Sequence, residues 1–217
     1  MTDYAARRIM MVDTQVRPSD VTKFPIIDAM LRVPREAFVP KQLAEAAYIG
    51  ENLELGDGRV LLEPRTLAKM LDALNIGDSD LVLDVACGLG YSTAVIAQLA
   101  EAVVGVEANA AMVAEAQAAL NGIGADNADI REAALTTGTP GSGPYDVIIV
   151  QGGIERFPDA LADQLAEGGR VACVFMDGAL GVVRVGVKKD GRIAWRDAFN
   201  AAAPVLAGFG RAREFSF

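Results

Sequence analysis

The chain has 217 residues, a formal net charge of −9 and a 52% hydrophobic composition, which excludes an intrinsically disordered protein. The acidic balance argues against nucleic acid as substrate or partner, because binding a phosphate backbone normally requires a basic face. Histidine is absent, so imidazole acid–base catalysis, Ser-His-Asp nucleophiles and histidine-rich metal sites are excluded, and we expect no metal site.

Targeting signals and cysteines point to the cytoplasm. No apolar run approaches the roughly 20 residues that a membrane span needs. Residues 1–8 lack the apolar core of a signal peptide. Cys87 and Cys173 are too few for a disulfide framework and indicate reduced thiols. We therefore expect a cytoplasmic protein with no membrane partner.

The N-terminal part of the chain predicts a helical cap. Residues 4–16 contain no helix breaker, and Pro25 lies at the permissive first turn of a second helix over 25–31. Ser19-Asp20 or Thr22 would cap that second helix. The shorter elements expected next are a turn around Phe38, a helix over 43–48 and an extended piece with a turn over 52–58.

A strand, a glycine turn and a helix start organise the rest of the chain. The apolar run 81–85 is typical of a strand buried on both faces of a parallel sheet. Gly88 and Gly90 allow a tight turn and close backbone approach, and Ser92 opens a helix that reaches about Leu99. A ligand at that helix start would meet unpaired backbone N–H groups.

The turn lacks the third glycine of a dinucleotide-binding loop, and this absence indicates which ligand it binds. Dinucleotide loops use Gly-x-Gly-x-x-Gly, whereas the third glycine position here is Thr93. Asp84 places a carboxylate at the strand end, which is unfavourable beside a pyrophosphate and favourable beside an ammonium or sulfonium. Glu107 ends the next strand, 17 residues after Gly90, where an acid can accept hydrogen bonds from two ribose hydroxyls. S-adenosylmethionine carries both cations and no phosphate, so this order of features predicts it as the cofactor.

Strands then alternate with helices until the chain ends in a hairpin. The helices expected are 65–74, which Gly77 would stop, 110–120 and 157–165; the strands expected are 103–106, 128–134, 147–150, 170–175 and a last one over 213–217. Residues 181–187 and 193–199 flank a two-residue hairpin turn at 189–192. This order predicts an α/β fold with a doubly wound, mostly parallel sheet of Rossmann-like type, an N-terminal helical cap and a C-terminal antiparallel hairpin. We expect a single domain over 1–217, made of a cap and lead-in (1–58), a cofactor-binding core (59–178) and a hairpin with a last strand (179–217).

Several motifs resemble those of the protein-L-isoaspartate O-methyltransferase family along most of the chain. The most specific of them is Val33-Pro34-Arg35-Glu36-Ala37-Phe38-Val39-Pro40. The others are Gln15-Val16-Arg17, Asp20-Val21, Ala47-Tyr48, Val82 to Ala97, Pro144 to Val150 and Gln164 to Arg170. The resemblance implies a methyltransferase fold and methyl transfer from S-adenosylmethionine to the free carboxylate of an isoaspartyl residue in a damaged protein. Such a carboxylate is ionised at neutral pH, so the transfer needs alignment and no general base, which fits the missing histidine.

The resemblance also implies which residues contact the cofactor. They are Asp84, Ala86, Cys87, Gly88, Gly90, Glu107, Ala108 and Ala134. Two positions depart from the family pattern. Leu62 stands in the slot of the family's catalytic serine, and Ala133-Ala134-Leu135 stands where the family has Gly-Asp-Gly, whose acid faces the adenine.

The acceptor side is therefore open to more than one interpretation. Leu62 cannot donate a hydrogen bond, and Glu63 adds a negative charge where an acidic acceptor would dock. Arg65 would either offset that charge or bind the carboxylate of the acceptor with two parallel hydrogen bonds. The simplest interpretation is that Leu62 is a core residue and that Glu63 and Arg65 form a solvated pair. The alternatives to an isoaspartyl enzyme are a cofactor-binding homologue with weak or no isoaspartyl activity and an enzyme that acts on a different small acceptor, such as a small carboxylate.

Overall fold

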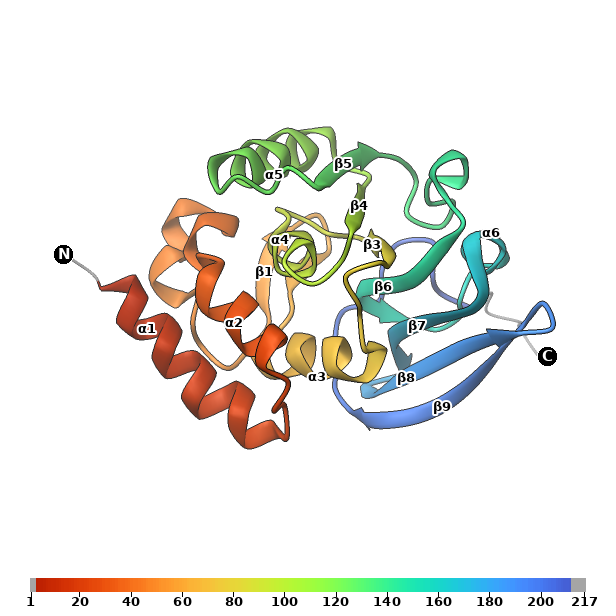
Figure 1. Ribbon diagram of the computed structural model, residues 1–217, viewed down its shortest axis with the longest axis horizontal. Helices are drawn as coiled ribbons and strands as arrows, with labels where there is room; N and C mark the ends of the chain where they lie inside the picture. The colour runs from red at the N-terminus through yellow and green to blue at the C-terminus, as the bar shows by residue number, and fades with distance from the viewer. Residues whose placement is uncertain (1–2, 212–217) are drawn as a thin grey trace, which may run out of the picture.

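The structure is a computed structural model that describes residues 3–211. Its centre is a seven-stranded sheet with the strand order β5-β4-β3-β6-β7-β8-β9 (Figure 1). The strands from β5 to β7 are parallel, and β8 and β9 extend the sheet as antiparallel strands. Their bounds are β3 Leu81–Val85, β4 Ala102–Glu107, β5 Ala128–Glu132, β6 Tyr145–Ile154, β7 Leu165–Asp177, β8 Leu180–Lys189 and β9 Arg192–Asn200. The predicted doubly wound α/β fold is confirmed, and the strand predicted over 213–217 lies outside the described residues.

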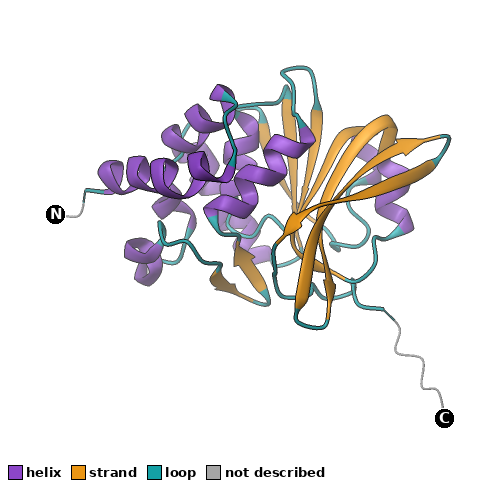
Figure 2. Cartoon of the chain, turned by 90° about the horizontal axis from the view of Figure 1, so that it is seen from below, coloured by secondary structure: helices purple, strands orange, loops and turns teal. Residues whose placement is uncertain are grey.

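Each face of the sheet has its own core, because successive side chains of a strand point to opposite faces. Val82 faces the N-terminal helices together with α3 (Pro64–Leu74), α4 (Tyr91–Ala97) and α5 (Ala110–Gly122). Leu83 faces the other core, which is covered by α6 (Asp159–Gln164) and by the segment around Leu206 and Phe209. Figure 2 shows most of the helices gathered beside one face of the sheet.

The strand order changes direction between β3 and β6. The chain goes from β3 outward to β4 and β5, then returns to the other side of β3 with β6 and continues to β7. In open parallel sheets, ligands bind outside the carboxyl ends of the strands at such a switch point. Asp84 near the end of β3 and Gln151 near the end of β6 lie at this point, and Glu107 ends the neighbouring β4.

The N-terminal cap is helical, as predicted. Helix α1 (Tyr4–Met11) continues through a π-helical turn, η1 (Val12–Val16), and a 3-10 turn, η2 (Arg17–Ser19). Helix α2 (Phe24–Arg32) has Pro25 in its first turn. The predicted caps Ser19-Asp20 and Thr22 were wrong, because the N-cap is Lys23, whose side chain makes no capping hydrogen bond.

Short 3-10 helices replace two elements expected after α2. The turn around Phe38 is the 3-10 helix η3 (Arg35–Phe38), and the helix expected over 43–48 is the 3-10 helix η4 (Lys41–Ala46). Each begins directly after a proline, Pro34 or Pro40. The two prolines leave runs too short for an α-helix, which needs several turns to be stable.

A small hairpin precedes α3. Strands β1 (Leu53–Gly56) and β2 (Arg59–Leu61) pair with each other as a separate two-stranded antiparallel sheet. The sequence predicted an extended piece and a turn here but not the second strand. Helix α3 is confirmed, and the four apolar residues on its predicted inner face, Leu67, Met70, Leu71 and Leu74, are buried. It ends at Leu74, as predicted, and the residue that stops it is Asn75 in the left-handed conformation, two residues before the predicted Gly77.

The later strands are longer than predicted, and α6 is shorter. Strand β7 begins at Leu165, before the glycine pair expected to start it, and its pairing with β6 is irregular between Tyr145 and Val147. The C-terminal hairpin is confirmed by the pairing of β8 with β9. Its turn residues Asp190 and Gly191 both have positive φ, 51° and 74°, as a two-residue hairpin turn requires.

We expect Leu71→Ala to lower the free energy of unfolding by about 2–5 kcal/mol, because Leu71 is fully buried between α3 and the sheet and its truncation leaves a cavity. The matched control is Leu180→Ala at a 78% exposed position, which should change stability by less than about 0.5 kcal/mol. Urea unfolding of both variants measures the difference. Equal destabilisation of the two variants would contradict the placement of α3 in the core.

Candidate cofactor site

The turn between β3 and α4 is held in an unusual backbone conformation. Ala86, Gly88 and Gly90 have positive φ values of 61°, 56° and 91°. The Cys87 N–H donates to the carbonyl of Val106 (3.2 Å), which ties the turn to β4. Left-handed alanine costs about 1–2 kcal/mol, and such conformations cluster at functional sites. The sequence indicated the role of the glycines but gave no signal for the strain at Ala86.

Asp84 is fully buried, and the structure shows partners for both of its oxygens. Its carboxylate accepts hydrogen bonds from Ser92 Oγ (2.6 Å), Thr93 Oγ1 (2.7 Å) and Gln151 Nε2 (2.8 Å). Burial raises the pKa of Asp84 to about 6, and the three donors oppose that rise. Asp84 therefore joins β3, α4 and β6 at the switch point. Gln151 was missed, although a glutamine directly after the apolar run 147–150 was the available signal.

Glu107 is the second carboxylate at this edge, and an arginine covers it. Arg59 of β2 donates from Nε to Oε2 (2.8 Å) and from Nη2 to Oε1 (2.9 Å). The backbone N–H groups of Gly88 (3.2 Å), Ala108 (2.7 Å) and Asn109 (3.0 Å) donate to the same carboxylate. Glu107 is 0% exposed and Arg59 is 6% exposed. The structure thus brings Glu107 and the glycine turn together, as the sequence predicted, and adds Arg59, which it did not.

The β1–β2 hairpin lies over the glycine turn. A Cβ placed on Gly88 would meet Leu55 Cδ1 at 2.9 Å, so the space above Gly88 is filled by Leu55 of β1. Asn109 donates from its side chain to the carboxylate of Asp57, in the turn of the hairpin. Arg59 also donates from Nη1 to the carbonyl of Asp57 (3.1 Å). In this structure the hairpin therefore covers the carboxyl ends of β3 and β4, the edge of the sheet at which the cofactor is expected; we call it the cofactor edge.

The remaining predicted cofactor residues lie around the same edge. Cys87 is buried, and burial raises the pKa of its thiol well above the usual range, so it is not a reactive thiolate. Ala108 and Ala134 are exposed. The Ala133 N–H donates to the Glu107 carbonyl (3.1 Å), which places the chain after β5 beside the end of β4. No contact of Ala134 to Asp84 or Glu107 is recorded, so its role stays a prediction.

Leu62, Glu63 and Arg65 lie where β2 passes into α3. Leu62 is 2% exposed, and its carbonyl accepts from Arg35 Nη2 (2.7 Å). Glu63 accepts from Thr66 Oγ1 (2.6 Å) and pairs with Arg65 at 3.6 Å. Arg65 is half exposed, at 41%, and its guanidinium lies 5.6 Å from the ring centroid of Phe199. The three residues therefore comprise one core side chain and one partly solvated ion pair.

Arg35, from the most family-specific string, is fully buried beneath this segment. Its Nε donates to the carbonyl of Ala47 (2.6 Å), and its guanidinium lies 4.7 Å from the ring centroid of Tyr91 at the start of α4. Burial lowers the pKa of Arg35. The contacts with Leu62 and Tyr91 make Arg35 the link between the cap, the serine-slot segment and the helix that follows the glycine turn. The sequence string was recognised as distinctive, but nothing in it indicated that its arginine is interior.

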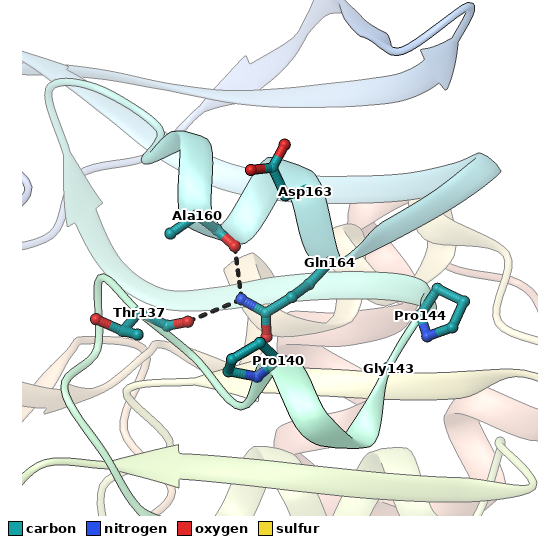
Figure 3. A pocket seen from close by; sticks show the side chains of 7 residues that line it. All are labelled: Thr137, Pro140, Gly143, Pro144, Ala160, Asp163 and Gln164. Atoms are coloured by element: carbon teal, nitrogen blue, oxygen red, sulfur yellow. Dashed lines mark hydrogen bonds between the residues drawn. The ribbon is translucent and has the colours of Figure 1, made fainter.

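One open cavity lies at another edge of the sheet. It has a volume of about 430 Å³ and is lined by Thr137, Pro140, Gly143, Pro144, Ala160, Asp163 and Gln164 (Figure 3). These residues lie at the amino ends of β6 and β7, the edge opposite to Asp84 and Glu107, because all these strands are parallel. The Gln164 amide donates to the carbonyls of Thr137 and Ala160, so the polar groups there are paired with the protein itself.

Two classes of feature are not found in residues 3–211. No cluster of three or more cysteine, aspartate or glutamate side chains there is arranged to hold a metal ion. None of the helices in that part of the chain combines the length and the apolar character needed to cross a membrane.

We expect Asp84→Asn to change how stability depends on pH. The pKa of Asp84 is higher in the folded protein, about 6, than its ordinary value of 3.8, so the folded state holds this proton more tightly. The stability contributed by this carboxyl is therefore present at low pH and lost as the pH rises through about 6, by roughly 3 kcal/mol in total.

Urea unfolding at several pH values tests this expectation. The free energy of unfolding of Asp84→Asn should rise relative to that of the native protein between about pH 4 and about pH 7. Asp177→Asn, which removes an exposed carboxylate at the end of β7, is the matched control. A difference between Asp84→Asn and the native protein that is independent of pH would refute the assignment.

The fold and the chain's sequence both have known counterparts. The sequence profile of the protein-L-isoaspartate (D-aspartate) O-methyltransferase family matches residues 9–200. A protein-L-isoaspartate O-methyltransferase 1 from Rhodopseudomonas palustris is 37% identical over 170 residues, which cover 78% of this chain and 69% of that protein. A protein-L-isoaspartate O-methyltransferase from Koribacter versatilis is 34% identical over 193 residues, covering 89% of this chain and 87% of that protein.

Solved structures agree with the fold. A protein-L-isoaspartate O-methyltransferase superposes with a TM-score of 0.82 at 23% identity, over 94% of this chain and 67% of that one. A putative enzyme of the same kind from Plasmodium falciparum, in complex with S-adenosyl-L-homocysteine, gives 0.77 at 20% identity, over 95% of this chain and 99% of that one. The family profile spans most of the described chain, and the relatives exceed 30% identity over more than two thirds of their own length. The chain therefore belongs to the protein-L-isoaspartate (D-aspartate) O-methyltransferase family.

Proposed function

We propose that this chain is an S-adenosylmethionine-dependent O-methyltransferase that binds its cofactor at the carboxyl edge of β3 and β4. The observation that supports this most directly is the arrangement of Glu107 against the glycine turn. The buried carboxylate of Glu107 lies 3.2 Å from the N–H of Gly88, next to the switch point of a parallel sheet. Family membership supplies the chemistry of the ligand that such an edge would hold.

The polar groups at this edge are of the types that S-adenosylmethionine would need for hydrogen bonding. Glu107 now accepts two N–H groups from one guanidinium, and two neighbouring ribose hydroxyls would present donors in the same paired way. The proposed cofactor contacts are Asp84, Ala86, Cys87, Gly88, Gly90, Glu107, Ala108 and Ala134. Among them Asp84 would act by positioning, since its oxygens are engaged by Ser92, Thr93 and Gln151.

The bound cofactor supplies a methyl group on a positively charged sulfur. The chain's own contribution would be alignment and exclusion of water, since a carboxylate acceptor is already ionised near neutral pH. The apolar side chain of Leu55 is buried over Gly88 and would help to keep this edge dry. Without histidine, the described groups offer alignment in place of a general base.

For the acceptor, we propose that transfer to isoaspartyl residues is weak, or that the acceptor is a smaller carboxylate. Leu62 would occupy the serine slot of the family, and its side chain is buried and carries no donor. Glu63 places a carboxylate beside it that is 25% exposed, which disfavours an acidic acceptor. Arg65 pairs with Glu63 at 3.6 Å but is 41% exposed, and it would be the acceptor's partner.

The three segments of the chain would act as one unit. Asn52 joins all of them, because its Nδ2 donates to the carbonyl of Ala202 (2.8 Å) and its Oδ1 accepts from the Glu63 N–H (2.8 Å). Asn52 belongs to the lead-in, Glu63 to the core and Ala202 to the tail. We therefore propose a single domain over 1–217, in which the described parts of 1–58, 59–178 and 179–217 enclose one site.

We expect the native protein to transfer methyl groups slowly to an isoaspartyl peptide and Leu62→Ser to do so about tenfold faster, the effect of one additional hydrogen bond of about 1.4 kcal/mol in the transition state. Incubation with labelled cofactor measures the rate. Leu61→Ser is the matched control, because Leu61 is the buried neighbour on β2. A native rate equal to that of Leu62→Ser would show that Leu62 is no obstacle.

Cofactor binding itself is tested by calorimetry with S-adenosylhomocysteine, the product form of the cofactor. We expect saturable heat from the native protein. No heat at millimolar ligand would disprove the proposed function, whatever the acceptor is.

A further inference from the structure

The ion pair between Arg59 and Glu107 differs from every other one in residues 3–211. Both of its side chains are nearly inaccessible, 6% and 0% exposed, whereas the other ion pairs in that range leave each side chain at least 13% exposed. Burying two charges is costly and is offset only by close geometry and further hydrogen bonds. Glu107 has both, through the guanidinium and three backbone donors.

The same carboxylate is the one that the proposed function assigns to the cofactor's ribose. Arg59 takes one oxygen with Nε and the other with Nη2, at 2.8 and 2.9 Å. The backbone N–H groups of Gly88, Ala108 and Asn109 already donate to the Glu107 carboxylate. A pair of ribose hydroxyls would therefore have to bind the same two oxygens at the position that the Arg59 guanidinium occupies. The guanidinium and the ribose cannot occupy this position together.

From this we infer that Arg59 is an internal competitor for the ribose site of Glu107, and that cofactor binding requires the tip of the β1–β2 hairpin, from Gly56 to Arg59, to move away from Glu107. The inference rests on the proposed function, since it concerns the same edge. It adds a residue that sets cofactor affinity. The apparent affinity is reduced by the fraction of molecules in which Arg59 has left Glu107.

The tip of the hairpin can move without breaking any strand pairing of the seven-stranded sheet, while the side chains of Leu53, Val60 and Leu61 stay buried in the core. Strands β1 and β2 pair with each other and not with the seven-stranded sheet. Three contacts hold the tip of the hairpin on the carboxyl edge of β3 and β4: Arg59 on Glu107, the Asp57 carboxylate on the Asn109 side chain, and Leu55 over Gly88. All three lie on the hairpin or on the edge beneath it, and none involves the pairing of β3, β4 or β6.

The decisive variant is Arg59→Gln, which keeps a polar side chain of similar length but removes the charge and the paired donors. Calorimetric titration with S-adenosylhomocysteine should give a Kd at least tenfold lower than that of the native protein. The matched control is Arg131→Gln on the neighbouring strand β5. Arg131 is 57% exposed and pairs with Asp129, so the control removes the same charge without touching Glu107 and should leave the Kd unchanged.

Arg59→Gln leaves a buried carboxylate without its cation and is the variant most at risk of misfolding. Two further measurements keep the inference testable if circular dichroism shows no cooperative unfolding. Arg59→Lys keeps the charge but loses the fork, and it should bind S-adenosylhomocysteine more tightly than the native protein. In the native protein, the Nε–H resonance of Arg59 should exchange with solvent at least tenfold faster at saturating S-adenosylhomocysteine than in its absence.

The outcomes separate this inference from the proposed function. The competitor role is overturned, and the cofactor assignment stays intact, if the native protein binds S-adenosylhomocysteine and folded Arg59→Gln binds it with an equal or higher Kd. Arg59→Lys takes the place of Arg59→Gln in this comparison if Arg59→Gln does not fold. An Arg59 Nε–H that stays protected in the complex also overturns the competitor role alone. No heat from the native protein and from the folded Arg59 variants at millimolar ligand overturns both. Tighter binding in the Arg59 variant with an unchanged control supports both.

Discussion

The three hydrogen bonds to Asp84 hold together the part of the molecule that the rest depends on. The donors come from two residues of α4 and one residue of β6, and the acceptor is on β3. These elements meet where the strand order reverses, so the carboxylate fixes the geometry of the switch point at which parallel sheets commonly bind ligands. The cost is visible in the pKa of Asp84, which burial raises to about 6. The buried carboxylate of Asp84 therefore serves to hold β3, α4 and β6 in position.

Glu107 uses burial differently. Its carboxylate has backbone donors on one side and the Arg59 fork on the other, so it is satisfied without any ligand. A buried ion pair of this kind adds little net stability, but breaking it by removing one partner is expensive. The structure thus shows Glu107 with the guanidinium as its partner, and the proposed function would give it the paired hydroxyls of the cofactor instead.

The fold was predictable because it follows from local patterns, and the site was only partly so. The run 81–85, the glycines after it and Glu107 at the end of the next strand are short-range features, and the sheet places them as expected. Gln151 and Arg59 reach the same edge from positions 67 and 48 residues away from their partners, and no spacing rule connects them. Arg35 shows the same limit, since a charged residue is expected to face water and this one lies inside. Long-range polar pairing is decided by tertiary packing, which the chain order does not reveal.

Asn52 gives the molecule a mechanical property. Its amide is fixed at both ends, to the carbonyl of Ala202 and to the N–H of Glu63, and the hairpin begins at the very next residue, Leu53. The tip of the β1–β2 hairpin would therefore move about a pivot at Asn52. Any outward movement of the hairpin would strain the segment after β9 and the start of α3 at the same moment, so cofactor entry would be coupled to Glu63 and Arg65, the residues proposed for the acceptor.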